Sequence, residues 1–113
     1  MFWVYILLCE DNSLYTGFTD DIKRRIYVHY HQLKSAAKYT KSHKVCGISA
    51  LWKTESETGA RKLEYRIKQL PKAKKLLLIE KPERAAEFFP ELSEFEFLPT
   101  LNQFYKDFVV LLY

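Results

Sequence analysis

Hydrophobic residues are concentrated in an unbroken run at the start of the chain. Residues 2–9 (FWVYILLC) are apolar and include β-branched and aromatic side chains, which is typical of a strand buried on both faces. The polar cluster EDNS at 10–13 indicates a turn, and LYTGF at 14–18 returns to strand-forming residues. The pattern predicts a β-hairpin made of residues 2–9 and 14–18.

Apolar residues then recur at helical spacing. Thr19 is expected to cap a helix that runs to about Leu33. Asp20 and Asp21 fall in its first turn, where carboxylates suit the helix dipole. At about 100° per residue, the apolar stripe of this helix consists of Ile22, Ile26, His29 and Leu33.

Two consecutive arginines fall on different sides of this helix. Arg25 lies about 60° from Ile22, at the edge of the stripe, whereas Arg24 lies at about 200° and faces water. Arg25 is therefore the arginine that can reach a partly buried site beside the sheet. His29 is on the buried side, where a lone histidine is usually a satisfied core residue.

The rest of the chain predicts an exposed loop, a third strand and two helices. Residues 34–44 (KSAAKYTKSHK) are small, polar and basic, and we expect them to form the loop. Residues 45–54 are expected to form the strand and residues 58–70 a helix. Pro71 begins a further helical segment, since proline is tolerated in a first turn. The expected fold class is α+β, with a small three-stranded antiparallel sheet flanked by helices.

Charge divides the chain into two parts. Residues 1–81 hold 16 Lys/Arg and 8 Asp/Glu, a net charge of +8, and residues 82–113 hold 2 and 6, a net charge of −4, which together give the +4 of the whole chain. A basic unit with many tyrosines has the charge expected of a polyanion binder. We expect residues 1–81 to form one domain and residues 82–113 to form an acidic, phenylalanine-rich C-terminal extension that folds back onto it.

The length of 113 residues suits a single packed core. No apolar run approaches the ~20 residues of a membrane span, and the apolar start lacks a basic leader and a small-residue cleavage site. A cytoplasmic protein without a membrane partner is expected. Cys9 and Cys46 lack metal-ligand spacing, and we expect both thiols to be buried.

Tyr5 and Tyr15 lie on the two strands of the predicted hairpin. Tyrosine favours strands, so sheet packing alone explains the pair. Register provides a test, because a hairpin loop with an odd number of residues places both side chains on one face and an even loop places them on opposite faces. A site shared by both tyrosines therefore requires an odd loop or a bulge.

Glu64 lies at the margin of the apolar stripe of the second helix. One interpretation is an exposed ion pair with Lys68, worth roughly a few tenths of a kcal/mol. The other is a magnesium ligand, since Mg²⁺ keeps several waters and takes only one or two protein carboxylates plus substrate phosphate.

Five segments occur in a fixed order: WVY at 3–5, YTG at 15–17, TDDIKRRIYVH at 19–29, KYT at 38–40 and LEYRIKQL at 63–70. Together they resemble the GIY-YIG nuclease superfamily, and more narrowly its small stand-alone, YhbQ-like (UPF0213-type) bacterial proteins. The resemblance covers about residues 2–80 and implies the GIY-YIG fold. The glycine of GIY is Trp3 here and the isoleucine of YIG is Thr16, and both variants are usual in this subfamily.

The resemblance implies roles for particular residues. The implied catalytic residues are Tyr5, Tyr15, Arg25 and His29, and the implied metal-binding residue is Glu64. Gly17 matches the glycine that closes the second half-motif, where a missing side chain lets substrate or backbone approach.

The implied activity is that of an endonuclease dependent on Mg²⁺ or Mn²⁺ that hydrolyses phosphodiester bonds, in DNA rather than RNA, in DNA repair or turnover. The metal at Glu64 would stabilise the leaving oxyanion, and Arg25 would stabilise charge on the phosphoryl oxygens. Tyr5 would take a proton from the attacking water, with Tyr15 or His29 positioning or relaying it. A free tyrosine has a pKa of about 10, so a nearby cation is expected to lower it, and activity is expected to rise towards alkaline pH.

Basic residues in the loop and the second helix could contact phosphates: Lys38, Lys41, Lys44 and Lys68. A solvated basic surface explains them equally well. No segment resembles a base-reading helix, so recognition of structure rather than sequence is expected.

Two alternatives remain open. One is a nucleic-acid binder on the same scaffold with little turnover. The other is a protein-interaction module or homodimer that uses the phenylalanines of the extension, although the same residues also suit a cover for the core. They are Phe88, Phe89, Phe95, Phe97, Phe104 and Phe108. A separate hypothesis places the acidic extension against the basic face, where it limits substrate access.

Overall fold

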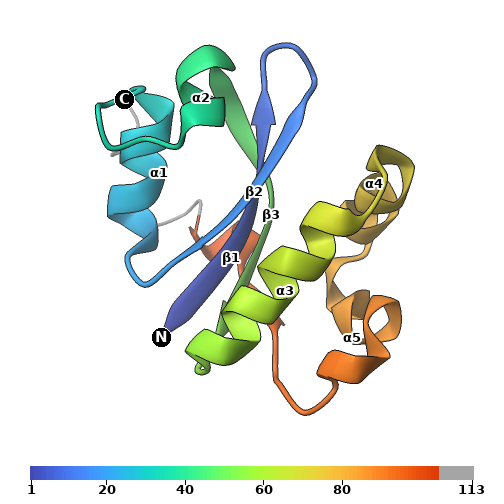
Figure 1. Ribbon diagram of the computed structural model, residues 1–113. Coiled ribbons are helices and arrows are strands. Elements are labelled where there is room, and N and C mark those ends of the chain that lie inside the picture. The colour runs from blue at the N-terminus through green and yellow to red at the C-terminus, as the bar shows by residue number, and fades with distance from the viewer. Residues whose placement is uncertain (105–113) are drawn as a thin grey trace.

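An antiparallel sheet of four strands runs through the middle of the molecule (Figure 1). The computed structural model describes residues 1–104. The strands are β1 (Phe2–Cys9), β2 (Leu14–Thr19), β3 (Val45–Thr54) and β4 (Leu98–Pro99), in the spatial order β2-β1-β3-β4. The α+β class with an antiparallel sheet is confirmed. The predicted number of three strands is one too few, because β4 has only two residues and pairs with Trp52 and Lys53 alone.

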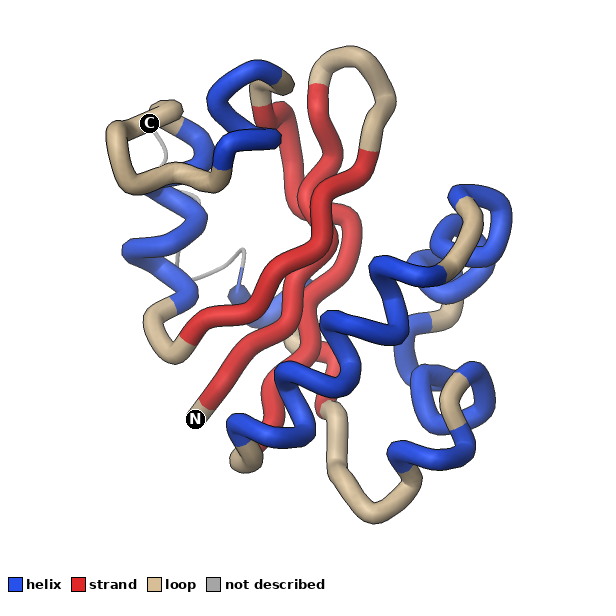
Figure 2. The backbone as a smooth tube through the Cα atoms, in the orientation of Figure 1, coloured by secondary structure: helices blue, strands red, loops and turns tan. Residues whose placement is uncertain are grey.

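Helices cover both faces of this sheet (Figures 1 and 2). On one side lie α1 (Ile22–Tyr30) and α2 (Lys38–Ser42). On the other side lie α3 (Glu57–Gln69), α4 (Lys72–Glu80) and α5 (Ala85–Phe88), with two short 3₁₀ turns at Pro82–Arg84 and Pro90–Leu92. β2 is an edge strand, and its outer edge faces the space between α1 and α3 (Figure 1).

Alternate residues of β1 enter two different cores, because successive side chains of a strand point to opposite faces. Val4 and Ile6 pack in the core beneath α3, which also contains Trp52, Leu63 and Ile67. Tyr5, Leu7 and Cys9 pack in the core beneath α1, with Ile22 and Ile26. The continuous apolar run of residues 2–9 is therefore buried on both faces, as its composition predicts.

The first helix is shorter than its sequence predicts. It begins after Asp21, whose side chain accepts a hydrogen bond from the backbone N–H of Arg24. Thr19 instead accepts a bond from the N–H of Asp21, so the cap is two residues later than expected. The helix ends at Tyr30, and Leu33 is 42% exposed rather than part of the apolar stripe. Gln32 adopts a positive φ of 52°, which ends the helical path.

The segment 34–44, expected to be an irregular loop, contains the one-turn helix α2. Its buried residue is Thr40, which is fully inaccessible to solvent. The two cysteines differ in their exposure to solvent. Cys9 is buried as expected, but Cys46 is exposed, because Val45 points into the core and its neighbour on the strand therefore points outwards.

Residues 82–97 fold back onto the α3 side of the sheet and complete its core, whereas Leu101 and Phe104 pack in the core beneath α1. Phe89 and Leu92 are buried in the core beneath α3, and the indole N–H of Trp52 donates to the carbonyl of Pro82 over 2.8 Å. Gly59 of α3 leaves room for the ring of Phe95, because a Cβ at this position would lie 2.8 Å from its Cδ1.

The described phenylalanines of the extension pack against the two cores rather than facing solvent. Phe89 is buried in the core beneath α3, with Phe88, Phe95 and Phe97 partly buried against it, and Phe104 is buried in the core beneath α1. Phe108 lies outside the described residues. No helix within residues 1–104 is long and apolar enough to cross a membrane.

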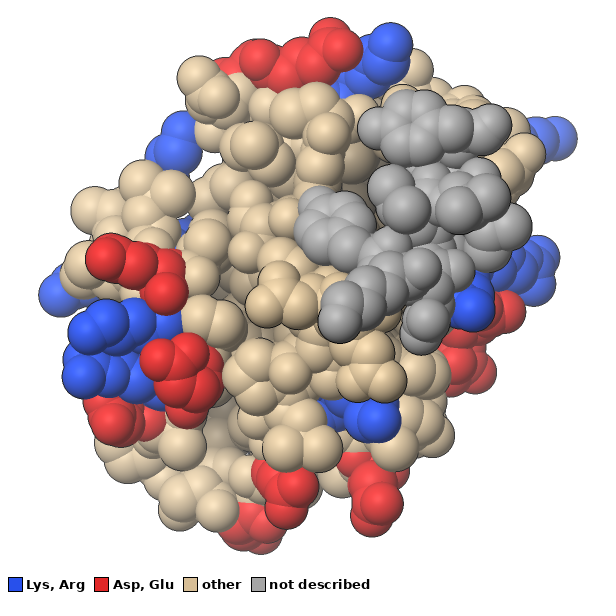
Figure 3. Space-filling model, turned by 180° about the vertical axis from the view of Figure 1, so that it is seen from behind, with Lys and Arg blue, Asp and Glu red and all other residues tan. Residues whose placement is uncertain are grey.

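Charge is spread unevenly over the surface. Seen from behind, acidic and basic side chains lie mainly around the rim, and the centre of the described surface is uncharged (Figure 3).

Candidate active site

The register of the hairpin places both tyrosines on one face of the sheet. Tyr5 lies opposite Gly17 and Leu7 lies opposite Tyr15, so odd-numbered residues pair with odd-numbered residues. The last pair before the turn is Leu8 and Leu14, which leaves a loop of five residues, an odd number. The condition for a shared site is therefore met, and the rings of Tyr5 and Tyr15 lie 6.5 Å apart between centroids.

Gly17 provides the space that the Tyr5 ring occupies. A Cβ at position 17 would lie 2.6 Å from the Cζ atom of Tyr5 and 2.9 Å from its Cε2, closer than such atoms approach in proteins. The phenol thus crosses β2 and extends towards the edge of the sheet. The space above this glycine is filled by the ring of Tyr5. A glycine is therefore needed at position 17 to accommodate that ring, whether or not substrate also approaches there.

His29 links Tyr5 to α2. Its Nε2 lies 2.9 Å from the hydroxyl of Tyr5, and its Nδ1 lies 2.8 Å from Oγ1 of Thr40. The imidazole is fully buried, and its ring centroid lies 5.7 Å from that of Tyr5 and 5.5 Å from that of Tyr15. Three of the predicted catalytic residues therefore form one aromatic cluster beside α1.

Arg25 is half-buried at the edge of this cluster, and Arg24 is exposed, as the helical spacing predicts. One guanidinium nitrogen of Arg25 donates to the carbonyl of Ser35 over 2.8 Å, which holds the side chain in place. A hydrogen bond and the charge of Arg25 both act on the phenol of Tyr5 to lower its pKa. Arg25 also lines an open hollow of about 220 Å³, together with Arg24, Ser35 and the acidic residues Asp20 and Asp21.

Burial dominates the protonation of the cluster. Desolvation raises the pKa of Tyr5 well above its usual value, and the charge of Tyr15 adds to this, so the opposing effects of Arg25 are outweighed. Arg25 therefore acts in the expected direction, but burial outweighs it and the pKa of Tyr5 stays above that of a free tyrosine. Burial also raises the pKa of Tyr15. For His29, burial and then the charge of Arg25 lower the pKa to about 4, so the imidazole is neutral at pH 7.

Glu64 approaches the cluster from α3, on the other side of the sheet. Its negative charge contributes to the raised pKa of both Tyr5 and Tyr15. The side chain is 21% exposed and lies 3.8 Å from Nζ of Lys68, which in turn lies 5.7 Å from the ring centre of Tyr15. The ion pair predicted for Glu64 is therefore present, and it lies next to the aromatic cluster.

The donor set suits a weakly held magnesium ion. No group of three or more histidine, cysteine or acidic side chains within residues 1–104 could enclose a metal. A single partly exposed carboxylate is compatible with Mg²⁺, which prefers oxygen and keeps most of its own water. Glu64 is the residue of the cluster that could hold it, in competition with Lys68.

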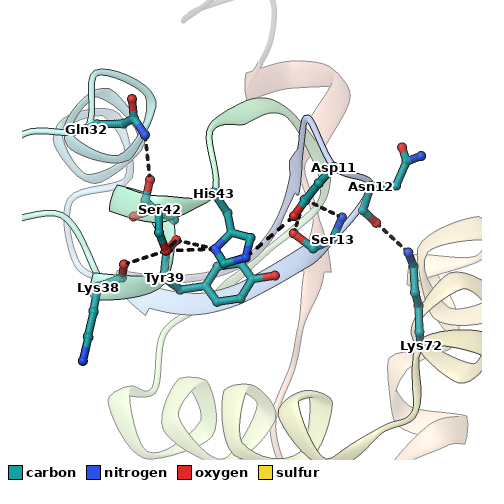
Figure 4. A network of polar contacts seen from close by, with 10 residues as sticks. Asp11, Asn12, Ser13, Gln32, Lys38, Tyr39, Ser42, His43 and Lys72 are labelled. Carbon is teal, nitrogen blue, oxygen red and sulfur yellow. Dashed lines mark hydrogen bonds and ion pairs between the residues drawn. The ribbon is translucent and has the colours of Figure 1, made fainter.

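A stack of rings, which the sequence did not predict, connects the cluster to the surface. Tyr15 stacks on Tyr39 of α2 with 5.7 Å between centroids, and Tyr39 stacks on His43 at 4.0 Å with an angle of 5° between the rings. His43 then lies 3.7 Å from the carboxylate of Asp11 at the tip of the hairpin (Figure 4). Tyr39 belongs to the KYT segment at 38–40, so the sequence does mark this position. The lysines around it, however, give no indication that the tyrosine packs against Tyr15.

Of the four predicted phosphate-binding lysines, Lys68 lies within the site, beside Glu64 and Tyr15, and the other three lie around it. Lys38, Lys41 and Lys44 are exposed on or next to α2. Lys44 lies 3.8 Å from Glu10 of the hairpin turn. On the other side of this turn, Lys72 of α4 donates to the carbonyl of Asn12 over 2.6 Å (Figure 4). The hairpin tip is thus held by contacts from both flanking helical units.

The site combines side chains from three elements: two tyrosines from a hairpin, an arginine and a histidine from one helix, and a glutamate from another. This arrangement is a nuclease-like scaffold. Residues 1–76 match the GIY-YIG catalytic domain family. The chain therefore belongs to the GIY-YIG family.

Similar proteins within this family are named UPF0213 proteins. One, OB0043 from Oceanobacillus iheyensis, is 42% identical over 78 residues, which cover 69% of this chain and 88% of that protein. Another, from Syntrophus aciditrophicus, is 43% identical over 83 residues, covering 73% of this chain and 94% of that protein. The solution NMR structure of the UPF0213 protein BH0048 from Bacillus halodurans has 38% identity, covers 71% of this chain and 84% of that one, and superposes with a TM-score of 0.45.

Proposed function

We propose that this chain is a metal-dependent endonuclease that hydrolyses phosphodiester bonds in DNA, directed by the structure of its substrate rather than its sequence, and acts in DNA repair or turnover. The observation that carries the proposal is the hydrogen bond between the buried hydroxyl of Tyr5 and Nε2 of His29, beside Arg25 and within the electrostatic reach of Glu64. Membership of the GIY-YIG family supports a nucleic-acid substrate in general.

Arg25 binds and stabilises the reacting phosphate. It is a fixed cation in a partly buried position, where a charge interacts more strongly than in water. Its bond to Ser35 uses part of the guanidinium and keeps the side chain in place. Lys68 and the exposed lysines Lys38, Lys41 and Lys44 contact the flanking phosphates.

Tyr5 transfers the proton of the attacking water to His29. A free phenolate at Tyr5 is disfavoured because its pKa is raised, but the phenol can accept the water proton while its own proton moves to Nε2 of His29. This route needs His29 to be neutral, and its low pKa keeps it so at pH 7. A phosphate bound at Arg25 offsets one of the two causes of that low pKa and makes His29 a better base when substrate is present.

Glu64 is the residue that would hold Mg²⁺ or Mn²⁺, and the metal would supply positive charge for the leaving oxygen. The weak ion pair with Lys68, at 3.8 Å between partly exposed groups, is a small barrier to the binding of a divalent ion.

The test is cleavage of labelled single-stranded, duplex, flap and branched DNAs in Mg²⁺ or Mn²⁺, with an RNA strand for comparison. Two variants remove the chemistry: Tyr5→Phe, which keeps the ring, and Glu64→Gln, which keeps the shape. Glu57→Gln is a matched control for the second, because Glu57 lies in the same helix and also pairs with a basic residue four positions later, Arg61.

We expect the natural chain to cleave DNA only when the metal is present. The rate should fall at least about 100-fold in Tyr5→Phe, which is the usual contribution of general acid–base catalysis, and by a similar factor in Glu64→Gln. The Glu57→Gln variant should cleave at the natural rate. Cleavage that survives both substitutions would overturn the proposal. Tight DNA binding without cleavage in either metal would instead favour the binding module.

A further inference from the structure

Thr40 makes two hydrogen bonds with a single hydroxyl group. Its Oγ1 lies 3.0 Å from the carbonyl oxygen of Ala37 and 2.8 Å from Nδ1 of His29, and the residue is fully buried. The carbonyl of Ala37 can only accept, so the one proton of the hydroxyl is donated to it. Oγ1 must then act as the acceptor towards His29.

This assignment determines the tautomer of His29. Nδ1 carries the proton that is donated to Thr40, and in a neutral imidazole Nε2 is then a lone-pair acceptor. Nε2 faces the hydroxyl of Tyr5 at 2.9 Å, so Tyr5 is the donor in that bond. The hydroxyl of Thr40 thus sets the direction of all three hydrogen bonds in this series: Tyr5 donates to His29, His29 donates to Thr40, and Thr40 donates to the carbonyl of Ala37.

We infer that Thr40 is a positioning residue for catalysis: it holds His29 in the Nδ1–H tautomer, so that Nε2 can receive the proton of Tyr5. The inference rests on the proposed nuclease function and deepens it by assigning a residue that does not touch the substrate.

The proton transfer balances through this chain of groups. A proton leaves the attacking water for the oxygen of Tyr5, and the original hydroxyl proton of Tyr5 moves to Nε2 of His29. His29 becomes an imidazolium that donates from Nδ1 to Thr40 and from Nε2 to Tyr5, and Tyr5 ends as a neutral phenol. In the opposite tautomer Nε2 already carries a proton and cannot accept another, so the transfer stops at Tyr5.

The backbone supports this geometry. The carbonyl of Ala37 lies at the start of α2 and also accepts the N–H of Lys41 at 3.1 Å. Gln32 donates its side-chain N–H to the carbonyls of Thr40 at 3.3 Å and Lys41 at 3.1 Å. The helical turn that carries Thr40 is therefore tied to the end of α1, the helix that carries His29.

The experiment compares the full chain with Thr40→Val, which keeps the shape and removes the hydroxyl, and Thr40→Ser, which restores a hydroxyl. Thr16→Val is the control, because Thr16 is also buried and its hydroxyl has no hydrogen-bond partner within residues 1–104. The first measurement is the pair of ¹⁵N chemical shifts of the His29 ring at pH 7, which report the tautomer without any substrate. The second is the rate of DNA cleavage as a function of pH.

We expect the natural chain, Thr40→Ser and Thr16→Val to show protonated Nδ1 and bare Nε2. Thr40→Val should shift towards the other tautomer or a mixture, and its maximal cleavage rate should fall about 10-fold or more with little change in KM, since general-base catalysis contributes about 10²–10⁴-fold. Protonated Nε2 in the natural chain, or a Thr40→Val chain with unchanged ¹⁵N shifts and cleavage, would overturn the inference. If the natural chain cuts no DNA while Thr40→Val still changes the tautomer, the nuclease proposal fails and the control of His29 by Thr40 stands.

Discussion

Substitution of Gly17 by alanine tests the arrangement on which the site depends. The new Cβ would lie 2.6 Å from Cζ of Tyr5 and 2.9 Å from Cε2. The ring cannot easily move away, because Tyr5 is only 1% exposed and its hydroxyl is bonded to His29. Overpacking of this kind costs about 1–3 kcal/mol.

Gly47 provides a matched control. It also lies in a strand, neither glycine has a positive φ, and a Cβ at Gly47 would meet nothing within 4 Å. Replacing a glycine by alanine without strain stabilises by about 0.4–1 kcal/mol through the unfolded chain. We therefore expect Gly47→Ala to be neutral or slightly stabilising and Gly17→Ala to be destabilising by about 1–2 kcal/mol net.

The assay is urea unfolding followed by circular dichroism, with cleavage measured in parallel. The Gly17→Ala penalty should shrink in a Tyr5→Leu background, where the ring is absent, and this double-mutant cycle isolates the steric contact. Equal unfolding midpoints for Gly17→Ala and Gly47→Ala, or a penalty that persists without the Tyr5 ring, would refute the explanation of Gly17 given above.

Three further predictions concern stability. The pKa of His29 falls from 6.5 to about 4 on folding, so the unfolded chain binds a proton first as pH drops. The free energy of unfolding should therefore fall by up to about 3 kcal/mol between pH 6.5 and pH 4. In a His29→Gln chain, the urea midpoint should lack this pH dependence. Gly59→Ala should not show the usual gain of about 1 kcal/mol for a helix interior, because its Cβ would meet Phe95, and thermal unfolding in a Phe95→Ala background should restore the gain. Trp52→Phe should cost about 1–3 kcal/mol in urea unfolding, because it leaves the carbonyl of Pro82 without its donor.

Periodicity was sufficient to predict much of the scaffold. The spacing of apolar residues can be read from the sequence alone. It is sufficient to predict the buried run of β1, the bounds of β3 and the contrast between Arg24 and Arg25. The helix cap was misplaced because Thr19 and Asp21 are both good capping residues, and the choice between them depends on the path of the chain out of β2.

The remaining features depend on contacts between distant segments. Thr40 lies among lysines, and nothing near it in sequence indicates full burial or a bond to His29, eleven residues earlier. The lowering effect of Arg25 on the pKa of Tyr5 follows from the helical spacing, but the burial that outweighs it depends on how distant segments pack. The two-residue strand β4 carries no periodic pattern and forms only because β3 offers it an edge.

The hypothesis that the acidic extension covers the basic face and limits substrate access is tested by changing its charges rather than by truncating the chain. A chain that ends near residue 82 would lose Phe89 and Leu92 from the core, so its behaviour with nucleic acid would report unfolding. Charge-neutralising changes at exposed positions such as Glu94 and Glu96 keep the core intact and test the electrostatic effect alone.

The packing of residues 78–92 beneath α3 has a consequence for the limits of the folding unit. Leu78, Phe89 and Leu92 lie beyond the family match at residues 1–76, yet they share a core with Val4 and Ile6 of β1. A fragment that ended at the family match would therefore leave part of this core exposed to water. The segment that the family has in common and the segment that folds cooperatively have different limits in this protein.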